Sequence, residues 1–170
     1  MSRSKDSGEK SRAASDLFTD LYPGLAGWCR RLVDDDGTAH EIASEAFTRL
    51  WGHWTAVREP RGFLYVTAAN LVRDHWRKLD RERRAIRQVT AEAELAHHQE
   101  GPDASISVRM LVRSLPERLR TPVLLYYYAD LPIREIAQLT RRKEGTVKSD
   151  LHAARELLRA GLGGYLDHAH

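Results

Sequence analysis

The sequence predicts an all-α protein built from two small helical domains joined by a flexible linker, the C-terminal domain carrying a helix-turn-helix. Apolar residues recur every three or four positions through most of the chain, and no alternating strand pattern or Asn-Gly hairpin signal stands out. A stretch rich in Ala and Glu, broken by Gly101 and Pro102, separates two such helical segments. With 42% hydrophobic residues, each segment can bury a core, although both are near the lower size limit for independent folding.

The first domain is expected at residues 16–86, after a disordered tail at 1–15 that is basic and polar. Asp16 is a plausible N-cap for the first helix, which should end at the DDDG stretch of residues 34–37. A second helix should begin at Thr38, because a glutamate three residues later completes the pattern of a capping box.

A loop is expected at residues 55–62, which contain a proline and a glycine, and a long third helix at 63–85, whose C-terminal part is basic. Residues 87–105 are predicted to form the linker. The second domain, with the helix-turn-helix, should occupy residues 106–164, followed by a short tail at 165–170.

The charge distribution divides the chain in the same way. Residues 73–87 contain seven Arg or Lys and three Asp or Glu, a net charge of +4, whereas residues 88–108 contain four acidic residues and no Arg or Lys. Residues 109–170 contain eleven basic and seven acidic residues, again a net charge of +4. Two basic blocks around an acidic spacer indicate two surfaces that attract a polyanion; the alternative is two ordinary solvated helix faces.

The segment REIAQLTRRKEGTVKSDLHAAR, residues 134–155, contains two helical patterns separated by a short basic stretch. Winding residues 145–159 at 100° per residue gathers Val147, Leu151 and Ala154 on one stripe and leaves polar and basic residues on the other side. In a helix-turn-helix the second helix enters the major groove, where Lys, Arg, Ser and Thr contact phosphates and bases. The alternative is a two-helix hairpin with a solvated polar face.

This segment resembles region 4 of bacterial RNA polymerase sigma factors of the extracytoplasmic-function (ECF) type, with IA, EGTVKS, LH and AR at the spacing of that family. The first half of the chain resembles region 2 of the same family. The sequence AHEIASEAFTRLW is similar to its polymerase-binding helix, and PRGFLYVTAANLVRDHWRK to its promoter-reading helix. The resemblance covers about residues 16–86 and 106–162.

The resemblance implies a sigma factor that binds core RNA polymerase and directs promoter-specific transcription initiation in the cytoplasm. Region 2 would recognise and melt the minus-10 element, region 4 would recognise the minus-35 element, and an anti-sigma factor is an expected partner. The residues expected at minus-35 DNA are Arg141, Arg142, Lys143, Thr146, Lys148, Ser149, His152 and Arg155. Those expected at minus-10 DNA are Trp54, Arg58, Arg61, Asn70, Arg73, Arg77 and Lys78. Those expected at the polymerase are Glu41, Ser44, Glu45 and Leu50.

The chemistry of the minus-10 set suits this task, because melted DNA is held by aromatic and basic residues that occur together. By the resemblance, the loop at residues 54–62 captures a flipped base, and the amide of Asn70 can read a base edge. The alternative for the larger aromatics is burial, which we favour for Trp51 and Phe63 because such residues anchor small cores.

The chain departs from the family pattern at several positions. Arg141 stands where the family has a turn glycine, so we expect a reshaped turn or an ordinary φ, because glycine tolerates positive φ and arginine does not. Arg142 and Lys143 also depart from the family's turn, and Ser44 replaces a common glutamine. Pro122 fits best in a first helical turn capped by the preceding threonine.

Other function classes have little support. Cys29, the single cysteine, is expected to be a small buried residue in a reducing compartment, and no apolar run long enough for a membrane helix occurs. The His97 and His98 pair has no further ligand at metal spacing, so no metal, cofactor or catalytic residue is expected. A helical repressor or activator that never touches polymerase is the main rival, and it would leave the first half of the chain unused.

Overall fold

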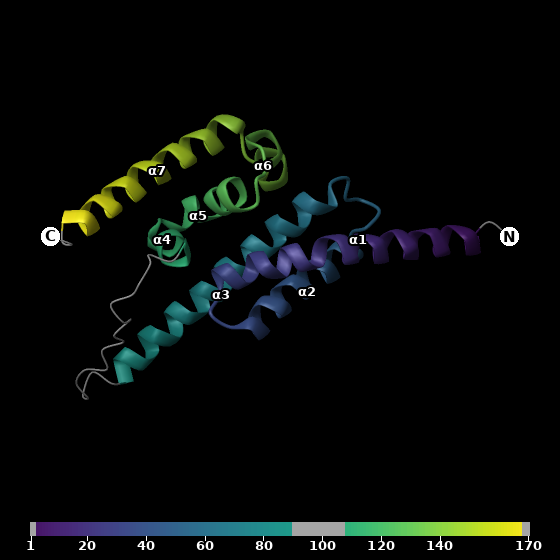
Figure 1. The fold of residues 1–170 in the computed structure, drawn as a ribbon, viewed down its shortest axis with the longest axis horizontal. Coiled ribbons are helices and arrows are strands. Elements are labelled where there is room, and N and C mark those ends of the chain that lie inside the picture. Colours follow the sequence, from purple (N-terminus) through teal and green to yellow (C-terminus); the bar gives the residue numbers. More distant parts are fainter. Residues whose placement is uncertain (1–2, 90–107, 168–170) are drawn as a thin grey trace.

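The computed structural model describes residues 3–89 and 108–167, which form helices arranged in two units (Figure 1). The first unit consists of α1 (Arg3–Leu32), α2 (Asp36–Gly52) and α3 (Pro60–Val89). The second consists of α4 (Val108–Ser114), α5 (Glu117–Val123), the π-helical turn η1 (Leu124–Tyr128), α6 (Ile133–Thr140) and α7 (Glu144–Asp167). No strand occurs within these described ranges, which confirms the all-α fold class.

In the first unit, α2 packs against both α1 and α3 around a core of large side chains. Trp28, Phe47 and Trp76 are fully buried there, as the helical stripes of the sequence require. The indole nitrogen Nε1 of Trp76 donates a hydrogen bond to the backbone oxygen of Leu32 at 3.0 Å, which ties α3 to the end of α1. Trp76 is therefore a core residue.

Three helix starts differ from the sequence prediction. Helix α3 begins at Pro60 rather than at residue 63, because proline is well suited to the first turn of a helix. Helix α1 begins at Arg3, so residues 3–15 are helical rather than a disordered tail, and Asp16 lies inside the helix instead of capping it. This stretch contains no proline, and once a helix has formed on a packed segment it extends at little cost.

The N-cap of α2 is Asp35, not Thr38. Its carboxylate oxygen Oδ2 accepts hydrogen bonds from the backbone nitrogen of Thr38 at 2.7 Å and from the Thr38 hydroxyl at 2.9 Å. These two hydrogen bonds hold the pKa of Asp35 below its ordinary value. The carboxylate of the acidic DDDG stretch therefore competes successfully for the cap, because it accepts from a free N–H more strongly than a hydroxyl does.

The second unit contains a helix that passes through a proline. Pro122 lies inside α5, whose N-cap is Pro116, and the helix continues directly into the π-helical turn η1. The expectation of a first-turn proline capped by Thr121 is wrong, because Thr121 is a buried residue of α5 itself. The proline has no N–H, so the carbonyl of Arg118, four residues earlier, loses its helical partner.

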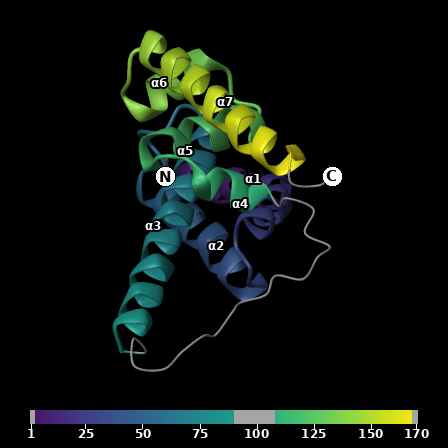
Figure 2. The ribbon, with the colours of Figure 1, turned by 90° about the vertical axis from the view of Figure 1, so that its left-hand side faces the viewer.

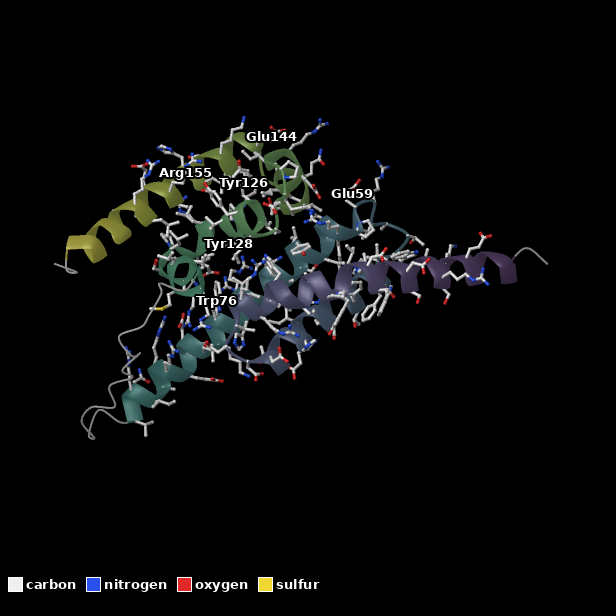
Figure 3. All side chains as sticks on the ribbon, in the orientation of Figure 1. Glu59, Trp76, Tyr126, Tyr128, Glu144 and Arg155 are labelled. Carbon is white, nitrogen blue, oxygen red and sulfur yellow. The ribbon has the colours of Figure 1, made fainter. Side chains whose placement is uncertain are left out.

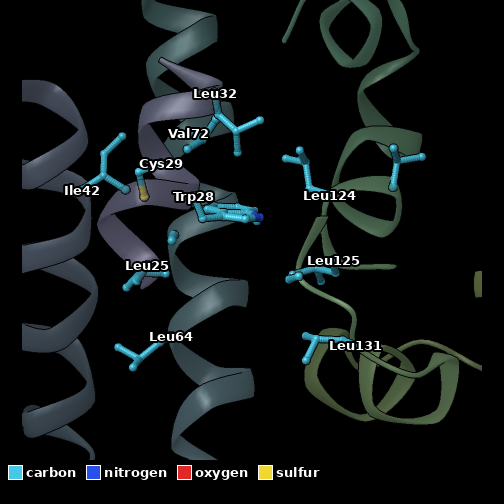
Figure 4. Packing of buried hydrophobic residues seen from close by; sticks show 14 of the residues in the cluster. Leu25, Trp28, Cys29, Leu32, Ile42, Leu64, Val72, Leu124, Leu125 and Leu131 are labelled. Carbon is cyan, nitrogen blue, oxygen red and sulfur yellow. The ribbon is translucent and has the colours of Figure 1, made fainter. Parts of the chain in front are cut away.

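The two units pack against each other along α3 and α1, and their buried residues form one continuous core. Figures 1 and 2 both place the second unit alongside α3. In Figure 4, Trp28 of α1 points toward Leu124 and Leu125 of the second unit, all three of them buried. Of the expected linker 87–105, residues 87–89 belong to α3, and the remainder, with His97 and His98, lies outside the described residues.

Candidate nucleic-acid interface

Helix α7 presents a polar face to solvent while its apolar stripe packs on α5 and α6. Val147, Leu151 and Ala154 are buried, and Leu158 is half-buried, as the helical winding predicts. The exposed residues of this helix and the turn before it include Arg141, Lys143, Thr146, Lys148, Ser149, His152 and Arg155. Figure 3 shows Glu144 and Arg155 along α7 at the outer edge of the second unit. This face is exposed to solvent, and within it Arg155 donates a hydrogen bond to the hydroxyl of Tyr127 at 3.4 Å.

The turn between α6 and α7 keeps a left-handed residue although it lacks glycine. Arg141 has φ 55° and ψ 40°, so the expectation of a reshaped turn or an ordinary φ is wrong. The backbone nitrogen of Arg142 donates to the oxygen of Ala137 at 2.9 Å, and that of Arg141 to the oxygen of Gln138 at 3.3 Å. This pair of bonds is the Schellman pattern, in which the left-handed position normally costs least for glycine. The helix end thus imposes the backbone geometry on an unfavourable residue.

Arg142 is directed into the turn rather than toward solvent. Its guanidinium nitrogen Nη1 lies 3.0 Å from Oδ2 of Asp150 and donates to the backbone oxygen of Arg118 at 3.4 Å. The carboxylate of Asp150 is buried, and its other oxygen, Oδ1, accepts from Nη1 of Arg118 at 2.8 Å. Arg142 therefore supplies a donor to the carbonyl that Pro122 leaves unpaired in α5. Arg142 thus has a structural place in the turn, and since its side chain is 34% exposed, its contact with minus-35 DNA stays a prediction.

Three arginines of α3 that were expected at minus-10 DNA have protein partners. Nη2 of Arg61 donates to the backbone oxygen of Ala129 at 2.9 Å, and the Arg61 guanidinium carbon Cζ lies 5.0 Å from the ring centre of Tyr65. Arg73 and Arg77 both form ion pairs with Glu117 of α5. Burial lowers the pKa of Arg73, as expected for a guanidinium taken partly out of water.

The remaining residues of the expected minus-10 set lie on α3 and in the loop before it. Arg58 is exposed in the loop before α3, and Trp54 is half-buried there, packed against the core. Asn70 is half-buried on α3, and exposed Lys78 pairs within the helix with Glu82 at 3.9 Å. The structure thus places the expected minus-10 residues on α3 and in the loop before it. The second unit contacts three of them, Arg61, Arg73 and Arg77.

Helix α2 exposes Glu41, Ser44 and Glu45, and the Glu45 carboxylate pairs with Arg49 at 2.8 Å. Leu50 is fully buried, so it is a core residue and its expected contact with polymerase is wrong. The exposed apolar side chain on this helix is Trp51.

Sequence reasoning missed Trp51, whose side chain we expected to find in the core. Trp51 is 44% exposed, and its ring centre lies 5.8 Å from that of Phe47 and 6.1 Å from that of Phe18 in α1. The signal was available, because Trp51 follows Leu50 by 100° and leaves the stripe that Ala46 and Leu50 define.

A metal cluster and a membrane-spanning helix would each indicate another class of protein. In residues 3–89 and 108–167, no group of three or more His, Cys, Asp or Glu side chains could hold a metal ion. None of the helices in these ranges is long and apolar enough to cross a membrane. Cys29 is buried, as expected, and burial raises the pKa of its thiol to about 12.

Comparison with known proteins gives two family matches in the order of the two units. The family model for sigma-70 region 2 matches residues 17–82, and the model for sigma-70 region 4 matches residues 105–158. The chain is 29% identical over 163 residues to the ECF RNA polymerase sigma factor SigW of Bacillus subtilis, with 86% of each chain covered. It is 26% identical over 136 residues to the RNA polymerase sigma-E factor of Streptomyces coelicolor, covering 78% of this chain and 76% of that relative.

Among solved structures, the fold is similar to that of the sigma factor RpoE in its co-crystal structure with the anti-sigma factor NepR from Bartonella quintana. The TM-score is 0.57 with 16% sequence identity, over 88% of this chain and 96% of that chain. At this identity the likeness supports the fold alone.

Proposed function

The chain belongs to the sigma-70 family, as an RNA polymerase sigma factor of the ECF type that directs promoter-specific transcription, and on this premise we propose which surface performs each step. The observation that carries the proposal is the pair of basic helices, α3 and α7, one in each family region. Each has an apolar stripe in the core and basic residues outside that stripe.

We assign minus-35 recognition to the exposed face of α7. Lys148, Ser149 and His152 lie on the first turns of the helix, which is the part that enters the major groove in a helix-turn-helix. Arg141 and Lys143 flank them on the turn, where they can neutralise phosphates without reading sequence. Arg155, one turn further along, extends the same basic face.

We assign minus-10 recognition and melting to α3 and the loop before it. Arg61, Arg73 and Arg77 lie on one helix with Asn70, and Trp54 and Arg58 lie in the adjoining loop. Guanidinium groups hold phosphates, an amide reads a base edge, and an indole stacks on an unpaired base.

We assign polymerase binding to α2, through the exposed carboxylates of Glu41 and Glu45, with Ser44 between them. The exposed ring of Trp51, less than two turns after Glu45 on the same helix, adds an apolar anchor. Tryptophan is enriched among the residues that contribute most to binding at protein interfaces. The Bartonella relative was solved with an anti-sigma factor, and we propose that a protein of that class also regulates this chain. Its site of action is then the bacterial cytoplasm. Sigma factors are not enzymes, and we propose no reaction for this one.

The decisive experiment is in vitro transcription with purified core RNA polymerase and the full chain on a library of promoter sequences. We expect transcripts that depend on the added chain and that select sequences with two conserved elements. Core polymerase alone is the control for background initiation. A chain that bound DNA but neither co-purified with core polymerase nor stimulated transcription would be a repressor-type protein, and the assignment would be abandoned.

A further inference from the structure

We propose that Tyr127 is a further contact to minus-35 DNA, and that its hydroxyl and the guanidinium of Arg155 together form a pair of donors for one backbone phosphate. The inference rests on the proposed function, because it takes α7 as the helix that binds minus-35 DNA, and it adds a residue of η1 to that surface. Tyr127 lies outside residues 134–155, the segment from which the helix-turn-helix was predicted.

Tyr127 is an exposed aromatic residue in an element that otherwise faces inward. The four other residues of η1 are buried or half-buried, whereas Tyr127 is 42% exposed. The turn is π-helical, and the backbone nitrogen of Ala129 donates to the oxygen of Leu124 at 3.1 Å. Turns of this kind are rare and occur frequently at functional sites. Packing in the core thus accounts for the neighbours of Tyr127 but not for Tyr127 itself.

The exposed ring is held in place by the residue before it. The ring centres of Tyr126 and Tyr127 lie 4.9 Å apart with their planes at 88°, which is the edge-to-face geometry that aromatic pairs favour. Tyr126 packs against the core, and Figure 3 shows it with Arg155 on the α7 side of the second unit. A side chain that is already positioned loses little conformational entropy when it binds a ligand.

The hydroxyl of Tyr127 lies beside the basic face of α7. Nη1 of Arg155 donates a hydrogen bond to the Tyr127 hydroxyl oxygen at 3.4 Å. A guanidinium has donors and no acceptor, so the tyrosine oxygen must be the acceptor in this bond, and its own proton stays available for another acceptor. The two groups therefore offer two donors close enough together to reach one phosphate.

The positive charge of Arg155 is not neutralised by a carboxylate in the part of the chain that the structure describes. Two acidic residues of the same helix have other partners. Asp150 pairs with Arg142 at 3.0 Å, and Glu156 pairs with Arg159 at 2.9 Å. Because the Tyr127 hydroxyl is neutral, its hydrogen bond leaves the full charge of Arg155 for an anion.

The position of Arg155 along α7 favours a phosphate over a base. Arg155 follows Lys148 by seven residues on the same helix face, which is about 10 Å along the axis. The major groove is about 12 Å wide, so with the first turn of α7 among the bases, Arg155 and Tyr127 lie near the edge of the groove. Contacts from arginine and tyrosine to the phosphates there fix the orientation of the helix without reading sequence.

The first test compares two tyrosines of η1 from which the same atom is removed. The full chain with Tyr127→Phe or Tyr128→Phe is titrated against a fluorescently labelled duplex that has been selected from a randomised pool for binding to the unmodified chain. Tyr128 is the matched control because it is half-buried and packs against the core. We expect Tyr127→Phe to bind about three- to tenfold more weakly than Tyr128→Phe, the range for loss of one hydrogen bond. Equal affinities overturn the proposal.

The salt dependence of binding separates the tyrosine from the arginine. The slope of log affinity against log salt should become shallower by about one in Arg155→Ala, which loses a charged phosphate contact. The slope should stay unchanged in Tyr127→Phe, because the hydroxyl carries no charge. A slope that falls with Tyr127→Phe would mean that the hydroxyl acts only through Arg155, and the direct contact would be wrong.

The shared phosphate can be located with duplexes in which one phosphate at a time is replaced by an uncharged methylphosphonate. We expect one position at which this replacement weakens binding by the unmodified chain and by Tyr128→Phe, but has a smaller effect on Tyr127→Phe and on Arg155→Ala, because groups that share a contact are not additive. A purely structural effect of Tyr127 would not depend on a single phosphate. If no position behaves in this way, the proposal is overturned.

Lys148→Ala distinguishes failure of this inference from failure of the proposed function. Weaker duplex binding by Lys148→Ala but not by Tyr127→Phe would leave minus-35 recognition with α7 and remove Tyr127 alone from the surface. Unchanged binding by both variants, or no duplex binding by the unmodified chain, would overturn the assignment of α7 and this inference with it.

Discussion

Helices α3 and α7 have similar patterns of apolar and basic residues, but they differ in whether a carboxylate of the other unit pairs with their basic side chains. Each has a buried stripe and carries basic residues expected to contact DNA. On α7, Lys148, His152 and Arg155 are exposed, whereas on α3 Arg73 and Arg77 are held by Glu117 of the other unit. A basic helix face is thus not by itself a DNA-binding surface, because a carboxylate from elsewhere in the chain can already occupy it.

The difference follows from what each helix packs on. The inner stripe of α7 packs on α5 and α6 of its own unit, and its outer face is exposed. Helix α3 packs on α1 and α2 with one face and also contacts α5, α6 and η1 with another. Helix α7 therefore packs within its own unit, whereas α3 packs against elements of both units.

The largest expected effect tests the open face directly. Replacing Lys148 and Arg155 together with Ala should weaken binding to the minus-35 duplex about 100-fold, because a good contact to a base or phosphate contributes about 1–3 kcal/mol. The slope of log affinity against log salt should also become shallower by about one for each phosphate that the variant no longer neutralises. Fluorescence anisotropy of a labelled promoter duplex measures both quantities.

Arg12→Ala with Arg49→Ala is the control for this pair, because it removes the same charge from exposed positions of the first unit. Equal weakening of duplex binding by the two double variants would mean that only net charge matters and that α7 has no special role.

A smaller effect is expected from the contacts that hold α7 in place. Asp150→Asn should lower the free energy of unfolding by about 1–2 kcal/mol, since Arg118 and Arg142 then lose a buried charged partner but remain partly solvated. Chemical denaturation of the full chain measures this, with exposed Glu156→Gln as the control expected to change little. An unchanged stability would show that the pair with Arg142 contributes nothing to the turn.

A substitution in the turn between α6 and α7 should instead increase the stability of the chain. Arg141→Gly should raise the free energy of unfolding by about 1 kcal/mol, because glycine adopts a φ of 55° without a Cβ clash. Gln138→Gly, at an exposed position inside α6, should instead destabilise by about 1 kcal/mol through loss of helix propensity. Destabilisation by both substitutions would contradict the left-handed geometry.

The smallest effect concerns the first unit and its pH dependence. The pKa of Asp35 is lowered in the folded chain by its hydrogen bonds from Thr38, so its contribution is fully present above the unfolded value of about 3.9 and is lost as the pH falls through the lower folded value. The difference in melting temperature between the parent chain and Asp35→Ala should therefore shrink below about pH 4. A difference that stays constant into that range would rule out the ionised cap.

Local pattern was sufficient for much of the molecule. The helical class, the buried stripe of α7 and the burial of Cys29 follow from periodicity and composition, which depend only on near neighbours in the chain. Boundary predictions at Asp16 and Thr38 failed because propensity and capping signals compete over a few residues, and only the packed helix decides between them. The predictions for Leu50 and Trp51 were reversed, since Leu50 is buried and Trp51 is exposed. Adjacent residues at the edge of a helical stripe differ by 100° in direction, and the sequence pattern did not decide which of the two faces the core.

The sequence by itself determined two basic amphipathic helices and a helix-turn-helix, because the 3.6-residue period sorts apolar from charged side chains within each helix. Only the tertiary structure decided that Arg142 forms an ion pair with Asp150 and that Glu117 pairs with two arginines of α3, Arg73 and Arg77. It also decided that Arg141 adopts a left-handed backbone conformation in place of glycine. Those outcomes join residues that are distant in the chain or impose backbone geometry from outside. No local pattern in the sequence identifies the distant carboxylate that will form an ion pair with an arginine on a helix surface.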